Sequence, residues 1–239
     1  MLPPLVVVAM PVVVAPFAYV ASRDIWRVRR SMRLLSEGSY ADARVLHERI
    51  AQSWMRVLPG VAQASRYSIA LARHMEGDFE GALHVLSSID RRRLDANLGD
   101  AVTTLEATSL VLLGRDIEHA AALLEASTSA TSARPPEDLL FLAVAKQLLG
   151  DVREAGQLLE RAGTERSSAT PHHRAIFHTM RGLLLVALGH PERAVTELER
   201  ASEVPLQNWY TLRARALLPP PGRAEIDPRS SLAPTVSEP

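Results

Sequence analysis

An internal repeat constrains the fold of this 239-residue chain more than any other feature. Five times, an apolar-periodic segment ends at a glycine, and an alanine five or six residues later opens a second such segment. The glycines lie 39, 37, 36 and 39 residues apart, at Gly38, Gly77, Gly114, Gly150 and Gly189. Periods of roughly 20–50 residues are typical of stacked supersecondary units. The pattern therefore predicts an all-α chain of about five helix–turn–helix hairpins.

Small residues at fixed offsets predict where the two helices of each hairpin touch. A glycine lacks Cβ and can turn the chain at the end of the first helix. Small residues seven positions before each glycine would form the contact point on the first helix: Ser31, Ala70, Ala107, Ala143 and Gly182. Their counterparts on the second helix are Ala43, Ala82, Ala120, Ala155 and Ala194. Four residues further on, the same face carries Leu86, Leu124, Leu159 and Leu198, whereas the first hairpin has His47.

These residues give the chain, from about residue 22 to 202, a pattern that resembles the tetratricopeptide repeat (TPR) family. The resemblance implies a right-handed α-solenoid whose first helices line a concave groove. It also implies a protein that binds other proteins, and we expect no enzymatic activity. The chain departs from the family in its longer period and in lacking most of the aromatic residues of the first helix.

The N-terminal segment predicts a single membrane-spanning helix over residues 1–22. Residues 2–22 carry no charge, and about 20 residues at roughly 1.5 Å each cover the bilayer core. Arg23, Arg27, Arg29 and Arg30 follow directly, so the positive-inside rule places the repeats in the cytoplasm, on the inner membrane of a bacterial-type cell. The same arginines are suited to anionic lipid headgroups. The alternatives are a cleaved signal peptide, or an outward-facing periplasmic protein that assists secretion or envelope assembly.

Composition excludes several classes of function. The formal net charge is zero, which argues against nucleic acid as a partner. Cysteine is absent, which excludes disulfides, thiolate zinc sites and a cysteine nucleophile. No phosphate-binding loop, nucleophile elbow or His-Glu-x-x-His motif occurs, so we expect no catalytic residues, no cofactor and no metal. His172, His173 and His178 do not have the spacing of metal ligands on one helix face, and a metal protein or enzyme built on them is the less favoured alternative.

Local signals mark the later helices and the C-terminus. Thr170 followed by Pro171 predicts a helix start, as Pro136 does for the preceding hairpin. A final helix is predicted from Pro205 to about residue 218, and its Trp209, Tyr210 and Leu217 would cover the end of a domain spanning residues 23–218. The proline-rich residues 219–239 predict a disordered tail.

The resemblance also assigns a binding groove, at positions ten, six and three residues before each turn glycine. In the first hairpin these positions hold Val28, Met32 and Leu35, and the third hairpin is left out because its register is uncertain. The predicted partner-binding residues of the other hairpins are Tyr67, Leu71, His74, Leu140, Val144, Gln147, Thr179, Leu183 and Val186. This largely apolar set suits an amphipathic helix of a partner protein. The alternative is that the protein's own C-terminal helix fills part of the groove. We thus expect a membrane-anchored interaction scaffold.

Overall fold

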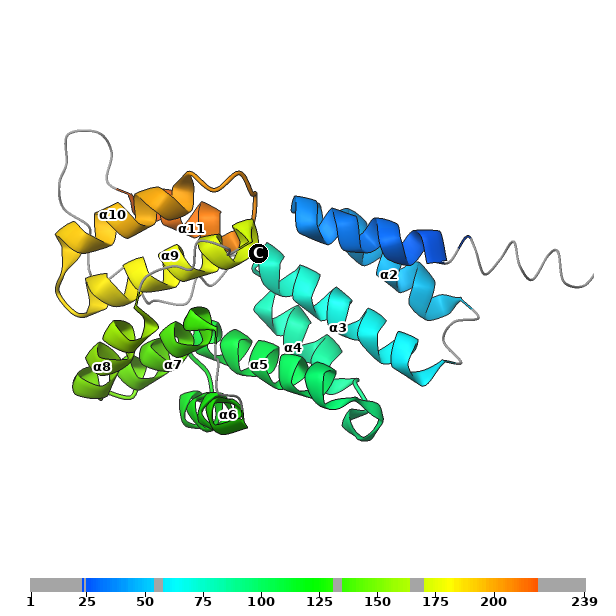
Figure 1. Ribbon diagram of the computed structural model, residues 1–239, viewed down its shortest axis with the longest axis horizontal. Coiled ribbons are helices and arrows are strands. Elements are labelled where there is room, and N and C mark those ends of the chain that lie inside the picture. The colour runs from blue at the N-terminus through cyan, green and yellow to red at the C-terminus, as the bar shows by residue number, and fades with distance from the viewer. Residues whose placement is uncertain (1–22, 24, 54–57, 131–134, 164–169, 219–239) are drawn as a thin grey trace, which may run out of the picture.

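The computed structural model describes residues 23, 25–53, 58–130, 135–163 and 170–218, and all regular structure in these ranges is helical (Figure 1). The predicted span over residues 1–22 and the predicted tail over residues 219–239 lie outside the described residues. Among the described helices, none is both long and apolar enough to cross a bilayer. A helix over residues 25–37 is followed by α2 (Tyr40–Gln52), α3 (Pro59–Glu76), α4 (Phe79–Ser87), the 3-10 turn η2 (Arg91–Arg93), α5 (Ala96–Leu113), α6 (Ile117–Ala130), α7 (Pro136–Leu148), α8 (Val152–Ala162), α9 (Pro171–Ala187), α10 (Pro191–Ser202) and α11 (Trp209–Leu217).

The five predicted hairpin turns are confirmed, and they share one backbone geometry. Each turn glycine has a left-handed φ: 82° at Gly38, 91° at Gly77, 65° at Gly114, 86° at Gly150 and 80° at Gly189. In every turn, the amide of the residue after the glycine donates to the carbonyl five positions earlier, as Asp78 does to Arg73 at 2.9 Å. This bond satisfies a carbonyl that the end of the helix would otherwise leave free.

The small-residue contact points are also confirmed. Ala43, Ala82, Ala120, Ala155 and Ala194 are all fully buried, as are Ser31, Ala70, Ala107 and Ala143 on the facing helices. The fifth hairpin uses Gly182 instead, where a Cβ atom would lie only 2.8 Å from the Leu198 side chain. Close approach of the two backbones therefore explains the residue types at these ten positions.

The helices stack in chain order, and the first helices of successive hairpins line one inner face. Each of the pairs α2–α3, α3–α4, α4–α5, α5–α6, α6–α7 and α7–α8 is in contact, and α7 packs directly on α9. One apolar core runs from the helix over residues 25–37 to α11, and a smaller cluster lies between α3, α4 and α5. In Figure 1, α6, α8 and α10 lie toward the outside, with α5, α7 and α9 on their inner side.

The last helix begins four residues later than predicted. Pro205 does not start it; α11 starts at Trp209, because Asn208 and Thr211 form a reciprocal capping box. The Asn208 side chain accepts from the Thr211 amide at 2.9 Å, and the Thr211 hydroxyl accepts from the Asn208 amide at 3.3 Å. Tyr210 and Leu217 are buried as predicted, with Trp209 half-buried.

The C-terminal segment also returns to the beginning of the stack. Helix α11 contacts α3 as well as α9 and α10. The side-chain amide nitrogen of Asn208 donates to the Tyr40 hydroxyl at 3.4 Å. Leu206 also lies close to Gly38, where an added Cβ would be 3.1 Å from its side chain. Tyr40 also meets the His172 ring edge-on, with centroids 5.8 Å apart. The first turn of the helical stack is therefore in contact with the segment that leads into its last helix.

Candidate functional site: the inner cavity

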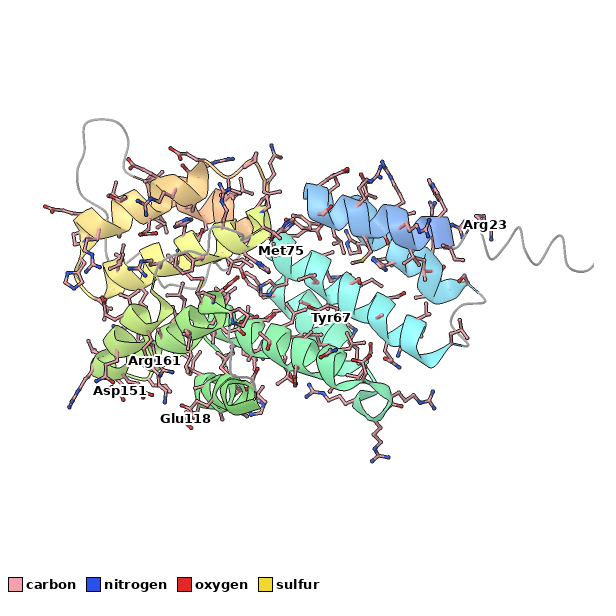
Figure 2. The ribbon with its side chains drawn as sticks, viewed as in Figure 1. Arg23, Tyr67, Met75, Glu118, Asp151 and Arg161 are labelled. Atoms are coloured by element: carbon pink, nitrogen blue, oxygen red, sulfur yellow. The ribbon has the colours of Figure 1, made fainter. Side chains whose placement is uncertain are left out.

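A cavity of about 380 Å³ lies on the inner face, between helices that are far apart in sequence. Tyr67 and Met75 mark its length along α3 (Figure 2). The opposite walls come from α5, α7, α9 and α11, with Tyr210 of α11 at one end. Its lining residues are Tyr67, Leu71, His74, Met75, Ala101, Thr104, Leu105, Thr108, Pro135, Glu137, Asp138, Phe141, His173, Ile176 and Tyr210.

The predicted partner-binding residues separate into two groups. Tyr67, Leu71 and His74 line the cavity. The other six do not: Gln147 is half-buried, and Leu140, Val144, Thr179, Leu183 and Val186 are all at most 3% exposed. The reason is the packing of α7 on α9 and of α11 on α9, which covers these inner positions with the protein's own helices. The Thr179 hydroxyl even donates to the Tyr210 carbonyl, at 3.1 Å.

Several lining residues were missed by the sequence reasoning. The same offset rule applied to Gly114 gives Thr104 and Thr108, which both line the cavity on α5. The extra residue between Gly114 and Ala120 lies after the turn, so it does not change the register of the helix before it. Phe141 and Tyr210 also line the cavity. Their positions depend on how successive hairpins are rotated relative to one another, which the sequence of a single repeat does not predict.

His74 is held in place by hydrogen bonds at both ring nitrogens. Its Nδ1 lies 2.8 Å from the Ser109 hydroxyl, and its Nε2 lies 2.6 Å from the Tyr210 hydroxyl. Ser109 donates its proton to the Leu105 carbonyl at 2.7 Å, so it accepts from His74 Nδ1, and Nε2 accepts from Tyr210. Burial lowers the pKa of His74 to about 3, and this arrangement keeps the ring neutral.

This trio of serine, histidine and tyrosine is not arranged for nucleophilic catalysis. Ser109 is fully buried and commits its proton to a helix carbonyl, so it has no base that could activate it. The chemistry that the trio supports is structural, because it ties α3, α5 and α11 together at the cavity wall.

The charged groups of the cavity are acidic. Glu137 and Asp138 lie at the start of α7, and no lysine or arginine is among the described lining residues. The Glu137 carboxylate lies 3.7 Å from Nδ1 of His173. Burial, with the charge of Asp138 in addition, raises the pKa of Tyr67. The cavity thus combines apolar walls with an anionic edge.

The three histidines that lie close together in the sequence, His172, His173 and His178, have different neighbours in the structure. His172 meets Tyr40, and burial lowers its pKa. His173 lies by Glu137, while Nδ1 of His178 is 2.7 Å from Glu197. Over the ranges that the structure describes, no group of three histidine, aspartate or glutamate side chains is placed to hold a metal ion.

Arg23, Arg27, Arg29 and Arg30, the predicted membrane-flanking residues, lie at or just before the start of the helix over residues 25–37. All except Arg27, which is half-buried, are exposed. None of these four arginines lines the inner cavity.

No protein-family model matches this chain, and no curated protein sequence matches it either.

Proposed function

We propose that this protein is a membrane-anchored scaffold, and that its inner cavity binds an apolar side chain presented by a partner protein. The observation that carries the proposal is the cavity itself. It has the size of a pocket for one or two large side chains, apolar walls from four hairpins and two carboxylates at its edge. An apolar anchor side chain seated in a pocket is the usual centre of a protein interface.

The acidic edge selects the kind of partner. Glu137 and Asp138 favour a segment with lysine or arginine next to the apolar anchor, because opposite charges steer association and fix orientation. The simplest partner segment with these features is an amphipathic helix. The site is smaller than the full-length groove that the TPR resemblance implies. For the membrane anchor, we propose residues 2–22, with the repeats on the cytoplasmic side, since the arginines follow that segment.

Binding rather than catalysis is supported by the state of the groups at the cavity. The one deeply buried histidine there uses both ring nitrogens within the protein and has a pKa lowered to about 3. It is therefore not available as a general base at neutral pH.

The experiment is a display-library selection of helical peptides against the full chain in non-ionic detergent micelles. Enriched peptides should combine a large apolar residue with lysine or arginine. Ala101→Trp fills the cavity from its α5 wall, where the residue is half-buried, and should lower the affinity of the selected peptides at least tenfold. Leu71 is a poorer choice for substitution, because it packs against both apolar clusters and a polar residue there would disturb the core.

Ala122→Trp is the matched control. It makes the same change on the exposed surface of α6, away from the cavity, and should leave peptide affinity unchanged. The proposal is wrong if no peptide is enriched over the empty micelle, or if the selected peptides bind Ala101→Trp as well as the natural protein.

A further inference from the structure

A second hollow of about 350 Å³ lies at the N-terminal end of the stack, away from the inner cavity. Its walls come from the helix over residues 25–37, from α2 and from α3. They are almost wholly apolar, with Val28 and Met32 on one side and Val61 and Ala64 on the other. Arg29 contributes the only permanent charge among the described lining residues. We call this hollow the N-terminal slot.

His47 gives the slot an unsatisfied polar group. The side chain is 3% exposed and lines the slot, yet neither ring nitrogen has a hydrogen-bond partner within the described part of the chain. A buried polar atom without a partner destabilises the folded protein, so this position is unfavourable for folding alone. In the other four hairpins, the same repeat position holds leucine. A ligand oxygen that enters the slot would accept from the one N–H of the neutral ring and so satisfy one of the two ring nitrogens.

The outer surface beside the slot has the composition of a bilayer-facing helix. Ile25 and Met32, which also line the slot, are 49% and 55% exposed, and Trp26 beside Ile25 is 61% exposed, so one helix presents three large apolar side chains to solvent. Arg29, Arg30 and Arg33 are exposed on the same helix. Exposed tryptophan with basic residues is typical of helices that lie at the membrane interface.

We propose that the N-terminal slot binds one acyl chain of an anionic phospholipid, with Arg29 contacting the headgroup phosphate and His47 donating to an ester oxygen. The charge of the slot argues for a lipid rather than for the partner peptide, because the inner cavity is acidic and the slot is basic. The position also fits, since the proposed membrane anchor ends three residues before Ile25. The inference rests on the membrane part of the proposed function and does not depend on the peptide site.

The test is native mass spectrometry of the full chain, released from non-ionic detergent in the presence of phosphatidylglycerol or phosphatidylcholine with identical acyl chains. The natural protein should retain phosphatidylglycerol about fivefold better, as expected for ~1 kcal/mol from one arginine near a lipid phosphate. Arg29→Gln should remove that preference. Arg49→Gln, which removes an exposed arginine from α2 outside the slot, should keep it.

A slot-filling variant separates specific binding from lipid that merely surrounds an anchor. Ala64 is exposed at the slot wall, so Ala64→Phe can fill the hollow without entering the core, and it should lower retention of both lipids at least fivefold. Val61→Phe serves as a second filling variant if circular dichroism shows that the first fails to fold. His47→Leu should weaken retention of both lipids while the preference for the anionic one persists.

The proposal is overturned if both filling variants retain lipid as the natural protein does, or if Arg29→Gln keeps the full preference. Failure here is distinguishable from failure of the peptide site. Ala64→Phe should leave peptide binding intact, and Ala101→Trp should leave lipid retention intact, because the two hollows share no lining residue.

Discussion

The Tyr210 hydroxyl donates to Nε2 of His74 at 2.6 Å, joining residues 136 positions apart in the chain. Both side chains are buried, and the other ring nitrogen of His74 donates to the Ser109 hydroxyl of α5. A single hydrogen-bonded group thus links the last helix to the second and third hairpins, at the wall of the inner cavity.

Removing the Tyr210 hydroxyl should destabilise the protein. Tyr210→Phe keeps the ring contacts but leaves His74 Nε2 buried without a donor, which costs about 1–3 kcal/mol in the free energy of unfolding. Urea unfolding followed by circular dichroism measures the change. Tyr67→Phe is the control: it makes the same change at a half-buried tyrosine of α3 that takes no part in the link to His74, so the expected change is smaller, below about 0.5 kcal/mol. Equal effects of the two substitutions would contradict the role assigned to the link.

Stability should fall as the pH drops below neutral. Burial lowers the pKa of His74 to about 3 and that of His47 to about 4, from 6.5 in each case. The unfolded chain therefore binds more protons than the folded chain from pH 6.5 down to these values, and the stability present above pH 6.5 is lost progressively across that window. Each histidine should contribute a slope of up to about 1.4 kcal/mol per pH unit.

His47→Leu isolates one of these slopes. The variant should show a weaker pH dependence between pH 6.5 and 4, and it should be more stable than the natural protein at pH 5, because a leucine needs no hydrogen-bond partner. Urea titrations at a series of pH values give both quantities. An unchanged slope would show that His47 titrates near its ordinary pKa in the folded protein.

Two glycine-to-alanine changes should have different effects on stability. Gly156 lies within α8, and a Cβ there would meet nothing within 4 Å, so Gly156→Ala should stabilise the protein by about 0.5–1 kcal/mol through helix propensity. Gly182 lies within α9, where a Cβ would come within 2.8 Å of Leu198. Overpacking should make Gly182→Ala about 1–3 kcal/mol less stable than Gly156→Ala. Thermal unfolding of the two variants side by side measures the difference.

Membrane orientation is predicted by the arginines that follow residue 22. A C-terminal fluorescent protein that folds only in the cytoplasm should be bright, and a phosphatase active only outside it should be silent. Replacing Arg23, Arg27, Arg29 and Arg30 with glutamine should raise phosphatase activity, since it removes most of the charge bias. Phosphatase activity in the natural chain would instead favour an outward-facing protein.

Local packing was predictable from the sequence because it depends on residues close together in the chain. Gly77 and Ala82 mark one turn and one helix contact, and the same offsets recur in every hairpin. The start of α9 at Pro171 was predictable for the same reason, since Thr170 caps it by accepting from the His173 amide at 3.4 Å.

The shape of the binding surface was predictable only in part. Tyr67, Leu71 and His74 follow from the repeat pattern, but the burial of Leu183 and Val186 follows from how α11 packs on α9. That packing depends on the summed rotation between hairpins, which small differences in each interface determine. The capping box at Asn208 and Thr211 was a readable local signal, and it corrects the start of the last helix.

The contacts of Asn208 with Tyr40 and of Leu206 with Gly38 carry a consequence for the history of the chain. Open repeat arrays gain and lose units by duplication and deletion, because each unit touches only its neighbours. Here an inserted or deleted hairpin would carry the last helix away from the first turn and break both contacts. The number of hairpins should therefore be conserved in descendants of this protein, while their surface residues are free to diverge.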